Sequence, residues 1–250
     1  MKKFKKPLLL LAVAAFWLAV WEVIALNAPT LLPIPTPWQV WLALAGLAKA
    51  PEFWKSCGYS LLRVAGGFLA AVVAGTVLAG LTVRFRAAHI LLSPLLLIVR
   101  STPVASFIIL CFMYFTSNTL PVFIAFLMVM PLVWGNVEKG IRGTDRTLLE
   151  MAAVFRMGAF RTFRHVRVPA VMPYFLSACT TGLGFAWKAS VAAEVISPPG
   201  HALGTLLLTA KRNIDLPQVF ASTVAVIVLS LLLEQLLLRL VRRAGREAQV

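Results

Sequence analysis

Arg100 and Lys188 are basic residues that stand inside long apolar segments of the sequence. A charged side chain in the middle of a membrane costs roughly 3 kcal/mol or more, so it usually faces the protein interior or a water-filled path. Pro103 adds to this signal, because a proline frees a backbone carbonyl and bends its helix close to Arg100. The side chains that could line a solute path are therefore Arg100, Ser101, Thr102, Pro103, Trp187, Lys188 and Glu194.

Two roles remain open for Arg100 and Lys188. They could pair with carboxylates on other helices, because buried charges usually compensate one another. The candidate partners for such pairs are Glu194, Glu234 and Glu22. The two cations could instead create a positive passage for an anionic solute such as a sulfonate. Lys188 and Glu194 lie about 240° apart around a helix, so we expect each to find its partner on another helix.

Other kinds of chemistry have little support. No G-x-x-x-x-G-K-[ST] sequence occurs, so nucleotide phosphates have no P-loop, and the G-L-G-F sequence at residues 182–185 favours helix packing. The cysteines and histidines are scattered, which predicts neither disulfides nor a metal site. The net charge is +15, but the basic residues fall between apolar segments, so nucleic acid is not an expected partner. We expect no cofactor in this chain.

Membrane helices are the elements that must hold the charged side chains. Hydrophobic residues make up 60% of the 250 residues and the mean hydropathy is +0.87, whereas soluble domains are roughly 45–50% apolar. A spanning helix needs about 20 apolar residues. We predict an all-α polytopic membrane protein with six transmembrane helices, at residues 7–26, 56–83, 90–115, 120–134, 170–196 and 219–241.

The segments around these helices complete the division of the chain. Residues 1–26 form a tail and the first span, 27–55 an outer loop, 56–241 a five-helix core and 242–250 a cytoplasmic tail. The start MKKFKK resembles a signal peptide, but no A-x-A-like site occurs near Leu26, so we expect an uncleaved anchor. In the outer loop, Trp38 and Trp41 after a run of prolines predict an amphipathic helix in the membrane interface. The fourth span is short and is expected to continue into its flanks.

The basic residues predict the orientation of the chain. Most of the 24 Lys and Arg residues lie in segments 2–6, 84–86, 139–167 and 239–246, and those predicted to lie outside are Lys49, Lys55, Lys211 and Arg212. Short loops rich in Lys and Arg stay in the cytoplasm, so both termini are predicted to be cytoplasmic. Glu22, Arg63 and Glu234 are expected to snorkel towards the membrane surface.

The longest predicted cytoplasmic loop, residues 135–169, has the pattern of two short helices. Thr144 or Asp145 can cap the first helix, which is expected to end near Gly158. Its apolar stripe has helical spacing and consists of Leu148, Leu149, Ala152, Ala153 and Phe155. Exposed apolar residues in such a loop favour docking to another protein. Binding of an interfacial helix to anionic lipid is the competing interpretation.

This loop resembles the coupling loop of permease subunits of bacterial ATP-binding-cassette importers. That family has the pattern E-A-A, three residues, G, nine residues, I-x-L-P, and the matching residues are Glu150, Ala152, Val166, Val168 and Pro169. Met151 stands where alanine is expected, Arg156 where glycine is expected, and Gly158 follows two residues later. The segments LLPIPTPWQV, SLLRVAGGFLAAVVAGTVLAGL, PLLLIVRSTPVASFIIL and GFAWKASVAAEVI resemble the nitrate, sulfonate and taurine branch of the family.

The resemblance implies the fold of a type I importer permease in the bacterial inner membrane. It implies a homodimer with a second permease copy, two cytosolic ATPases that hydrolyse the ATP, and an extracytoplasmic solute-binding protein. The chain itself would not be an enzyme. The substrate would be a sulfonate, taurine or nitrate-like anion, or else a heterocycle such as a thiamine precursor. An ion-driven transporter and a membrane scaffold are competing hypotheses, but no inverted repeat is evident.

The resemblance also implies which residues would contact the ATPase. Phe155 and Met157 would be apolar anchors. Glu150 would either contact the ATPase or serve locally, by capping the helix or pairing with an arginine. The implied coupling residues are Glu150, Ala152, Ala153, Phe155, Arg156, Met157, Gly158 and Pro169.

Overall fold

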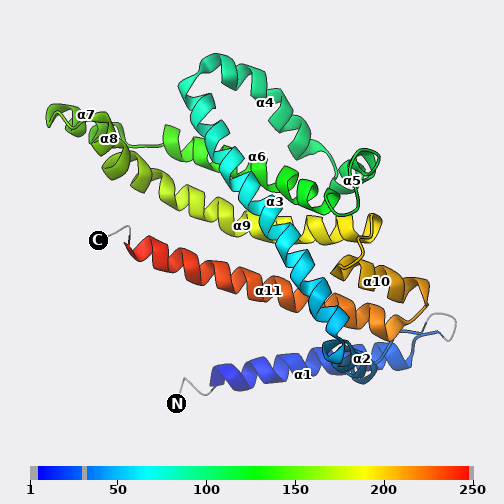
Figure 1. The fold of residues 1–250 in the computed structure, drawn as a ribbon. Coiled ribbons are helices and arrows are strands. Elements are labelled where there is room, and N and C mark those ends of the chain that lie inside the picture. Colours follow the sequence, from blue (N-terminus) through cyan, green and yellow to red (C-terminus); the bar gives the residue numbers. More distant parts are fainter. Residues whose placement is uncertain (1–4, 30–32, 248–250) are drawn as a thin grey trace.

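The computed structural model describes residues 5–29 and 33–247, and these residues form helices joined by short connections (Figure 1). The predicted tail residues 1–4 and 248–250, and residues 30–32 of the outer loop, lie outside the described residues. The helices are α1 (Lys5–Leu26), α2 (Pro37–Lys49), α3 (Pro51–Arg84), α4 (Arg86–Ser101), α5 (Val104–Phe112), α6 (Leu120–Arg142), α7 (Arg146–Val154), α8 (Ala159–Thr162), a π-helical turn (Phe163–Arg167), α9 (Val168–Ile196), α10 (Leu203–Arg212) and α11 (Leu216–Glu247).

Four helices of the described chain are long and apolar enough to cross a membrane. They are α3, α6, the segment Ala159–Ile196 that contains α9, and the Leu216–Leu236 part of α11. The bent pair α4 and α5 gives a fifth span if it crosses as one unit. The described apolar part of α1, Leu11–Leu26, is shorter than these four. A multi-pass membrane protein is therefore the observed class, and the count of six spans stays a prediction.

The third predicted span, residues 90–115, is broken rather than continuous. α4 ends at Ser101 and α5 begins at Val104, and the two helices are bent by 103°. Pro103 explains the break, because it has no N–H to donate and it holds the preceding residue in an extended conformation. Thr102 accordingly has φ −83° and ψ 131°. The bend expected at Pro103 is therefore confirmed, and it is large enough to interrupt the helix.

α3 and α6 pack with their backbones in close contact. A Cβ added at Gly75 would lie 2.8 Å from the Met130 carbonyl oxygen, and one added at Gly67 would collide with the Val122 carbonyl. Ala71 lies between these glycines, one helical turn from each, and is fully buried. Small residues spaced by four let membrane helices approach closely. This contact and the packing of α6 against α9 form the core that positions the site (Figure 1).

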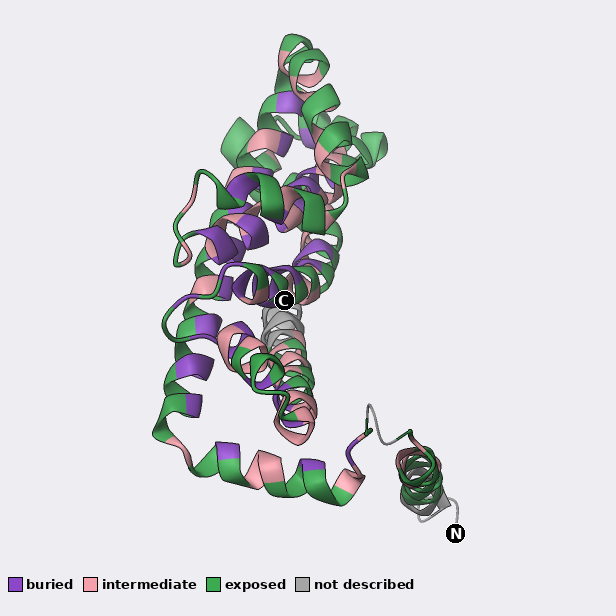
Figure 2. Ribbon diagram, turned by 90° about the vertical axis from the view of Figure 1, so that its right-hand side faces the viewer, coloured by how far each residue is buried: buried purple, intermediate pink, exposed green. Residues whose placement is uncertain are grey.

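α1 stands apart from this core in both views (Figures 1 and 2). Its described side chains are mostly exposed, but Trp21 is half-buried against the body of the protein. The Trp21 ring stacks on Phe220 at 6.0 Å, and its Nε1 donates to the Pro35 carbonyl at 3.1 Å. α2 buries Val40 against the body of the protein and leaves Trp38 exposed, and its location in the membrane interface stays a prediction.

Candidate translocation path and coupling loop

Arg100 and Lys188 are both exposed in this chain, although each lies in an apolar helix. Arg100 lines a cavity of about 330 Å³ together with Thr102 and Phe185. Lys188 lines a second cavity, of about 290 Å³, with Thr181, Phe185 and Glu234. Because Phe185 borders both cavities, the two cations lie on the same side of α9. The surface formed by these two cavities is named the cationic face below.

One hypothesis from the sequence was that Arg100 and Lys188 form ion pairs with glutamates on other helices. Within the described residues, no salt bridge joins Arg100 or Lys188 to Glu194, Glu234 or Glu22. Arg100 instead donates from Nη2 to the Pro131 carbonyl at 2.6 Å, and its guanidinium occupies the space left free by Gly135. The structural pairing of Arg100 and Lys188 with acidic residues is therefore not observed.

Glu194 belongs to a different place, a buried hydrogen-bond network at the opposite end of α9 from the loop. Its side chain is fully buried and accepts hydrogen bonds from Ser60 Oγ at 2.8 Å and from the Gly204 N–H at 3.2 Å. Arg63 Nη1 lies 3.2 Å from Glu194 Oε1 and forms a salt bridge. Every polar contact of the carboxylate is thus made by the protein itself, so Glu194 does not line the cationic face.

Arg63 also differs from its expected role as a snorkelling residue. Its side chain is only 10% exposed. Besides Glu194, it donates to the His201 carbonyl at 2.9 Å and to Asn118 Oδ1 at 3.1 Å. One guanidinium therefore ties α3 to α9, to the turn before α10 and to the turn before α6. No local pattern in the sequence signals this role, because the partners are far apart along the chain.

The other predicted path residues divide between the cationic face and the core. Trp187 is buried, and its Nε1 donates to the Val226 carbonyl on α11 at 3.2 Å, so it packs rather than lines a path. Ser101 and Thr102 both donate their hydroxyls to the Ile98 carbonyl, at 3.1 and 2.8 Å. Pro103 is exposed at the bend. The bend therefore lies beside Arg100, as the adjacency in sequence requires.

The first helix of the loop predicted to be cytoplasmic is α7, and Asp145 caps it. Asp145 Oδ1 accepts from the Thr147 N–H at 2.8 Å, whereas the Thr144 hydroxyl donates to the Gly140 carbonyl at 3.3 Å. Glu150 lies in the middle of α7, so its suggested role as an N-terminal cap is wrong. Glu150 is exposed and forms no salt bridge within the described part of the chain.

α7 ends at Val154, earlier than the predicted end near Gly158, in a left-handed turn at Arg156. Arg156 has φ 51°, while Gly158 has the ordinary φ of −61°. The Met157 N–H donates to the Ala152 carbonyl and the Arg156 N–H to the Ala153 carbonyl, both at 2.9 Å. This is the Schellman arrangement, whose αL position usually carries glycine. The glycine expected at position 156 is thus explained by backbone geometry.

This turn leads to opposite expectations for two substitutions at one position. Arg156→Gly removes the steric cost of a side chain at positive φ and is expected to leave stability unchanged or raise it by up to about 1 kcal/mol. Arg156→Val places a β-branched residue there and should destabilise the turn by more than about 1 kcal/mol. Limited proteolysis between α7 and α8 measures the effect. Equal cleavage of the two variants would contradict the assigned turn.

The loop presents an apolar surface at the end of the molecule, beyond the ends of α6 and α9 (Figure 1). Phe155 and Phe160 are each 73% exposed, and Val154 is 79% exposed. Among the predicted coupling residues, Ala152 is buried and Met157 is half-buried, so Met157 offers a partner less surface than Phe155 does. The exposed ones are Glu150, Ala153, Phe155, Arg156, Gly158 and Pro169.

Sequence reasoning missed a second polar network, which joins α3 to α6 and lies beside His89 of α4. Glu138 Oε1 accepts from Arg142 Nε at 2.9 Å and lies 3.2 Å from His89 Nδ1. Thr82 Oγ1 donates to Glu138 at 3.4 Å and accepts from Trp134 Nε1 at 3.0 Å. The i,i+4 spacing of Glu138 and Arg142 was the only signal available in the sequence.

Comparison with known proteins places these features in a family. Residues 71–246 match the model of the binding-protein-dependent transport system inner membrane component. A probable ABC transporter permease of Brucella melitensis is 32% identical over 179 residues, covering 71% of this chain and 72% of the relative. A putative aliphatic sulfonates transport permease of Bacillus subtilis is 28% identical, covering 88% and 79%.

One further relative and one solved structure extend the comparison over most of the chain. A bicarbonate transport system permease of Synechococcus elongatus is 24% identical, covering 94% of this chain and 90% of the relative. A crystal structure of an amino acid ABC transporter with histidines has a TM-score of 0.66 at 16% identity, and the match covers 82% of this chain and 97% of that one. The last comparison supports the fold.

Proposed function

Since the chain belongs to the family of binding-protein-dependent transport system inner membrane components, we propose that two copies of it form the path through which an anionic solute is imported. The protein is an ABC transporter permease subunit, a multi-pass membrane component that works with an ATPase and a binding protein. ATP hydrolysis is the task of the ATPase component. The homodimer, the two ATPase copies and the absence of a cofactor in this chain belong to the proposal.

The exposed cationic face is the observation that carries this proposal. A charged side chain cannot remain exposed to lipid at the middle of a membrane without a large cost. Arg100 and Lys188 are exposed in the single chain and form no salt bridge within its described residues. A second copy that covers this face would shield both cations from lipid and enclose a positive path between the copies.

An anion is the solute that such a path favours. Arg100 and Lys188 are donors without any acceptor capacity, and Thr181 adds a hydroxyl beside Lys188. Glu234 shares the Lys188 cavity and would limit the net charge of the path. Two relatives are named as permeases for aliphatic sulfonates and for bicarbonate, which are both anions. We therefore propose a sulfonate, taurine or nitrate-like substrate.

The cytoplasmic loop would couple this path to the ATPase. Phe155, the residue that follows α7, is exposed beyond the membrane bundle, where a partner groove can enclose it. α6 and α9 flank the loop directly, so movement of α7 on ATP binding would shift both spans between two states. This placement requires the loop to be cytoplasmic. The proposed orientation therefore has the N- and C-termini in the cytoplasm of a bacterial cell, in agreement with the distribution of Lys and Arg.

Uptake by the complete transporter in proteoliposomes tests the role of the cationic face. Lys188→Ala and Arg100→Ala should each lower uptake of the transported anion about 10- to 100-fold, the effect of losing one charged hydrogen bond of roughly 1.5–3 kcal/mol. Lys188→Arg should restore much of the rate. Arg212→Ala, which removes an exposed cation outside the membrane region, is the matched control.

The solutes are compared at equal concentration with the binding protein present. Sulfonate, taurine, nitrate and bicarbonate form one group, and a thiamine precursor represents the heterocycles. If Lys188→Ala and Arg100→Ala transported the anion as fast as Arg212→Ala does, the cationic face would not be the path. Preferred uptake of the heterocycle would contradict the anionic substrate.

A further inference from the structure

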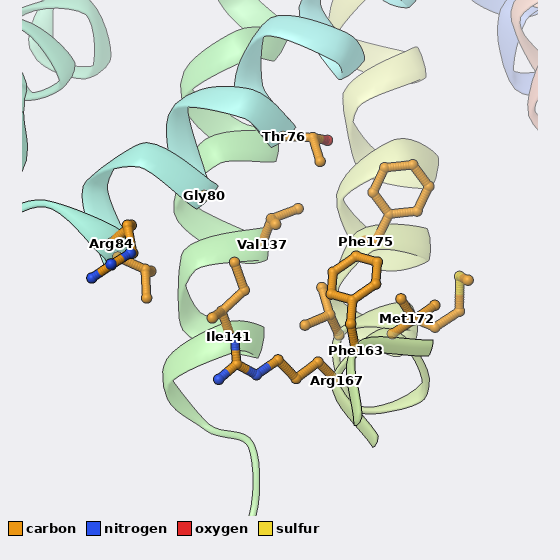
Figure 3. A pocket seen from close by; sticks show the side chains of 12 residues that line it. Thr76, Gly80, Arg84, Val137, Ile141, Phe163, Arg167, Met172 and Phe175 are labelled. Carbon is orange, nitrogen blue, oxygen red and sulfur yellow. The ribbon is translucent and has the colours of Figure 1, made fainter. Parts of the chain in front are cut away.

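A groove of about 670 Å³ lies between α3, α6 and α9, near the ends of these helices that adjoin the cytoplasmic loop (Figure 3). Its walls are mostly apolar. Val137 and Ile141 line it from α6, and Met172 and Phe175 from α9. Gly80 of α3 opens one wall, because a Cβ added there would meet no atom within 4 Å. The volume suits a flexible hydrocarbon chain better than a small polar solute.

The groove lies on the other side of α9 from the cationic face. Met172 lines the groove, and Thr181 lines the Lys188 cavity. These residues are nine positions apart, which corresponds to about 180° around a helix. An occupant of the groove is therefore separate from the solute in the proposed path. If the cationic face meets the second permease copy, the groove faces the bilayer.

Two arginines line the end of the groove nearest the loop. Arg84 is the last residue of α3, and Arg167 directly precedes α9 (Figure 3). Both side chains are exposed, and neither forms a salt bridge within the described residues. Among the described residues, no acidic side chain lines the groove. Glu138, the neighbour of Val137, is engaged by Arg142 and His89.

We propose that this groove binds an anionic phospholipid of the inner leaflet, with an acyl chain against α6 and α9 and its phosphate between Arg84 and Arg167. An acyl chain would cover the apolar walls, and a phosphate would accept hydrogen bonds from the two arginines. One anionic phospholipid supplies both groups. A free phosphate would leave the apolar walls uncovered. The proposal rests on the proposed orientation, which places Arg84 and Arg167 at the inner membrane surface.

The bound lipid would act on the base of the coupling loop. Phe163, from the π-helical turn between α8 and α9, lines the same groove. A lipid there would fasten the end of α3 to the beginning of α9, next to the segment that moves with α7. Anionic lipid would then stabilise the conformation of the loop in which the groove is open to the acyl chain, because the lipid binds that conformation more tightly.

Lipid titration of the purified permease–ATPase complex tests this site. Native mass spectrometry measures the binding of palmitoyl-oleoyl phosphatidylglycerol and of phosphatidylcholine with the same chains. The wild-type complex should prefer phosphatidylglycerol at least about tenfold, and Arg84→Gln combined with Arg167→Gln should remove this preference, because each basic residue near an anionic lipid contributes about fivefold in affinity. Gly80→Phe should weaken the binding of both lipids by filling the groove.

Matched controls separate the groove from general surface effects. Arg161→Gln with Arg164→Gln also removes two positive charges, at positions that do not line the groove, and Gly58→Phe adds the same ring to another open position on α3. Equal binding of the two lipids by the wild type would overturn the proposal. So would a Gly80→Phe variant that binds like Gly58→Phe, or an Arg84/Arg167 variant that binds like the Arg161/Arg164 variant. Solute uptake is not a readout here, so failure of the proposed solute path would leave this result unaffected.

Discussion

Replacing Glu194 with alanine is expected to lower the free energy of unfolding by roughly 3–5 kcal/mol, the typical cost of removing one partner from a buried ion pair. Arg63 would keep its charge at 10% exposure without a counterion. Ser60 Oγ and the Gly204 N–H would lose the oxygen that accepts their hydrogen bonds at present. The midpoint of thermal unfolding of the purified protein in detergent measures this loss.

Glu194→Gln separates charge from hydrogen bonding in this network. Its amide oxygen can still accept from Ser60 and Gly204, so the loss should be clearly smaller than for alanine. Glu52→Ala is the control, because it breaks only the exposed side-chain contacts of Glu52 with Lys55 and His201 and should change the midpoint little. A Glu194→Ala protein that unfolded at the same temperature as Glu52→Ala would show that the network does not hold α3, α9 and α10 together.

Replacing Phe155 with aspartate is the second change with a large expected effect. An apolar anchor at the centre of a protein interface commonly contributes about 2 kcal/mol or more, so we expect at least about a 30-fold loss of affinity for the ATPase. Folding should persist, because Phe155 is 73% exposed and supports no core contact. Co-purification of the ATPase and solute-dependent ATP hydrolysis measure the loss.

Ile214→Asp is the matched control for this experiment. Ile214 is an exposed apolar residue just after the end of α10, on the other end of the molecule from α7 (Figure 1). Its variant should keep the ATPase bound. If Phe155→Asp also retained the ATPase and kept hydrolysis coupled to uptake, α7 would not be the coupling contact, whatever the solute proved to be.

The features that depend on local sequence were largely predictable. Apolar runs of sufficient length predict α3, α9 and α11, because each satisfies its backbone hydrogen bonds within one segment. The short run 120–134 predicts α6, which continues to Arg142 as expected of its flank. Asp145 was one of two candidate caps, and the structure selects it. The family pattern expects glycine at position 156, where this chain has Arg156. Glycine is preferred where the backbone has a positive φ, and Arg156 has a φ of 51°.

The features that depend on distant contacts were not predictable from this one sequence. Arg63 and Glu194 are 131 positions apart, and no local pattern announces their pairing. Arg63 was expected at the membrane surface, because an isolated arginine in a span shows no sign of its partner. The break at Thr102 was only partly predictable, since a proline predicts a bend but not its size. The groove near Arg84 and Arg167 arises from three helices and has no sequence signature.

The glycine contacts between α3 and α6 have a mechanical consequence. A side chain between two helices can change rotamer and so accommodate a small displacement. Gly67 and Gly75 have no side chain that could do this. The backbone of α3 therefore contacts the Val122 and Met130 carbonyls of α6 directly. The two helices should therefore move together as one rigid unit. A displacement of α7 would then move the other ends of α3 and α6 by nearly the same amount. If longer side chains separated the two helices, they would change rotamer and the transmitted displacement would be smaller.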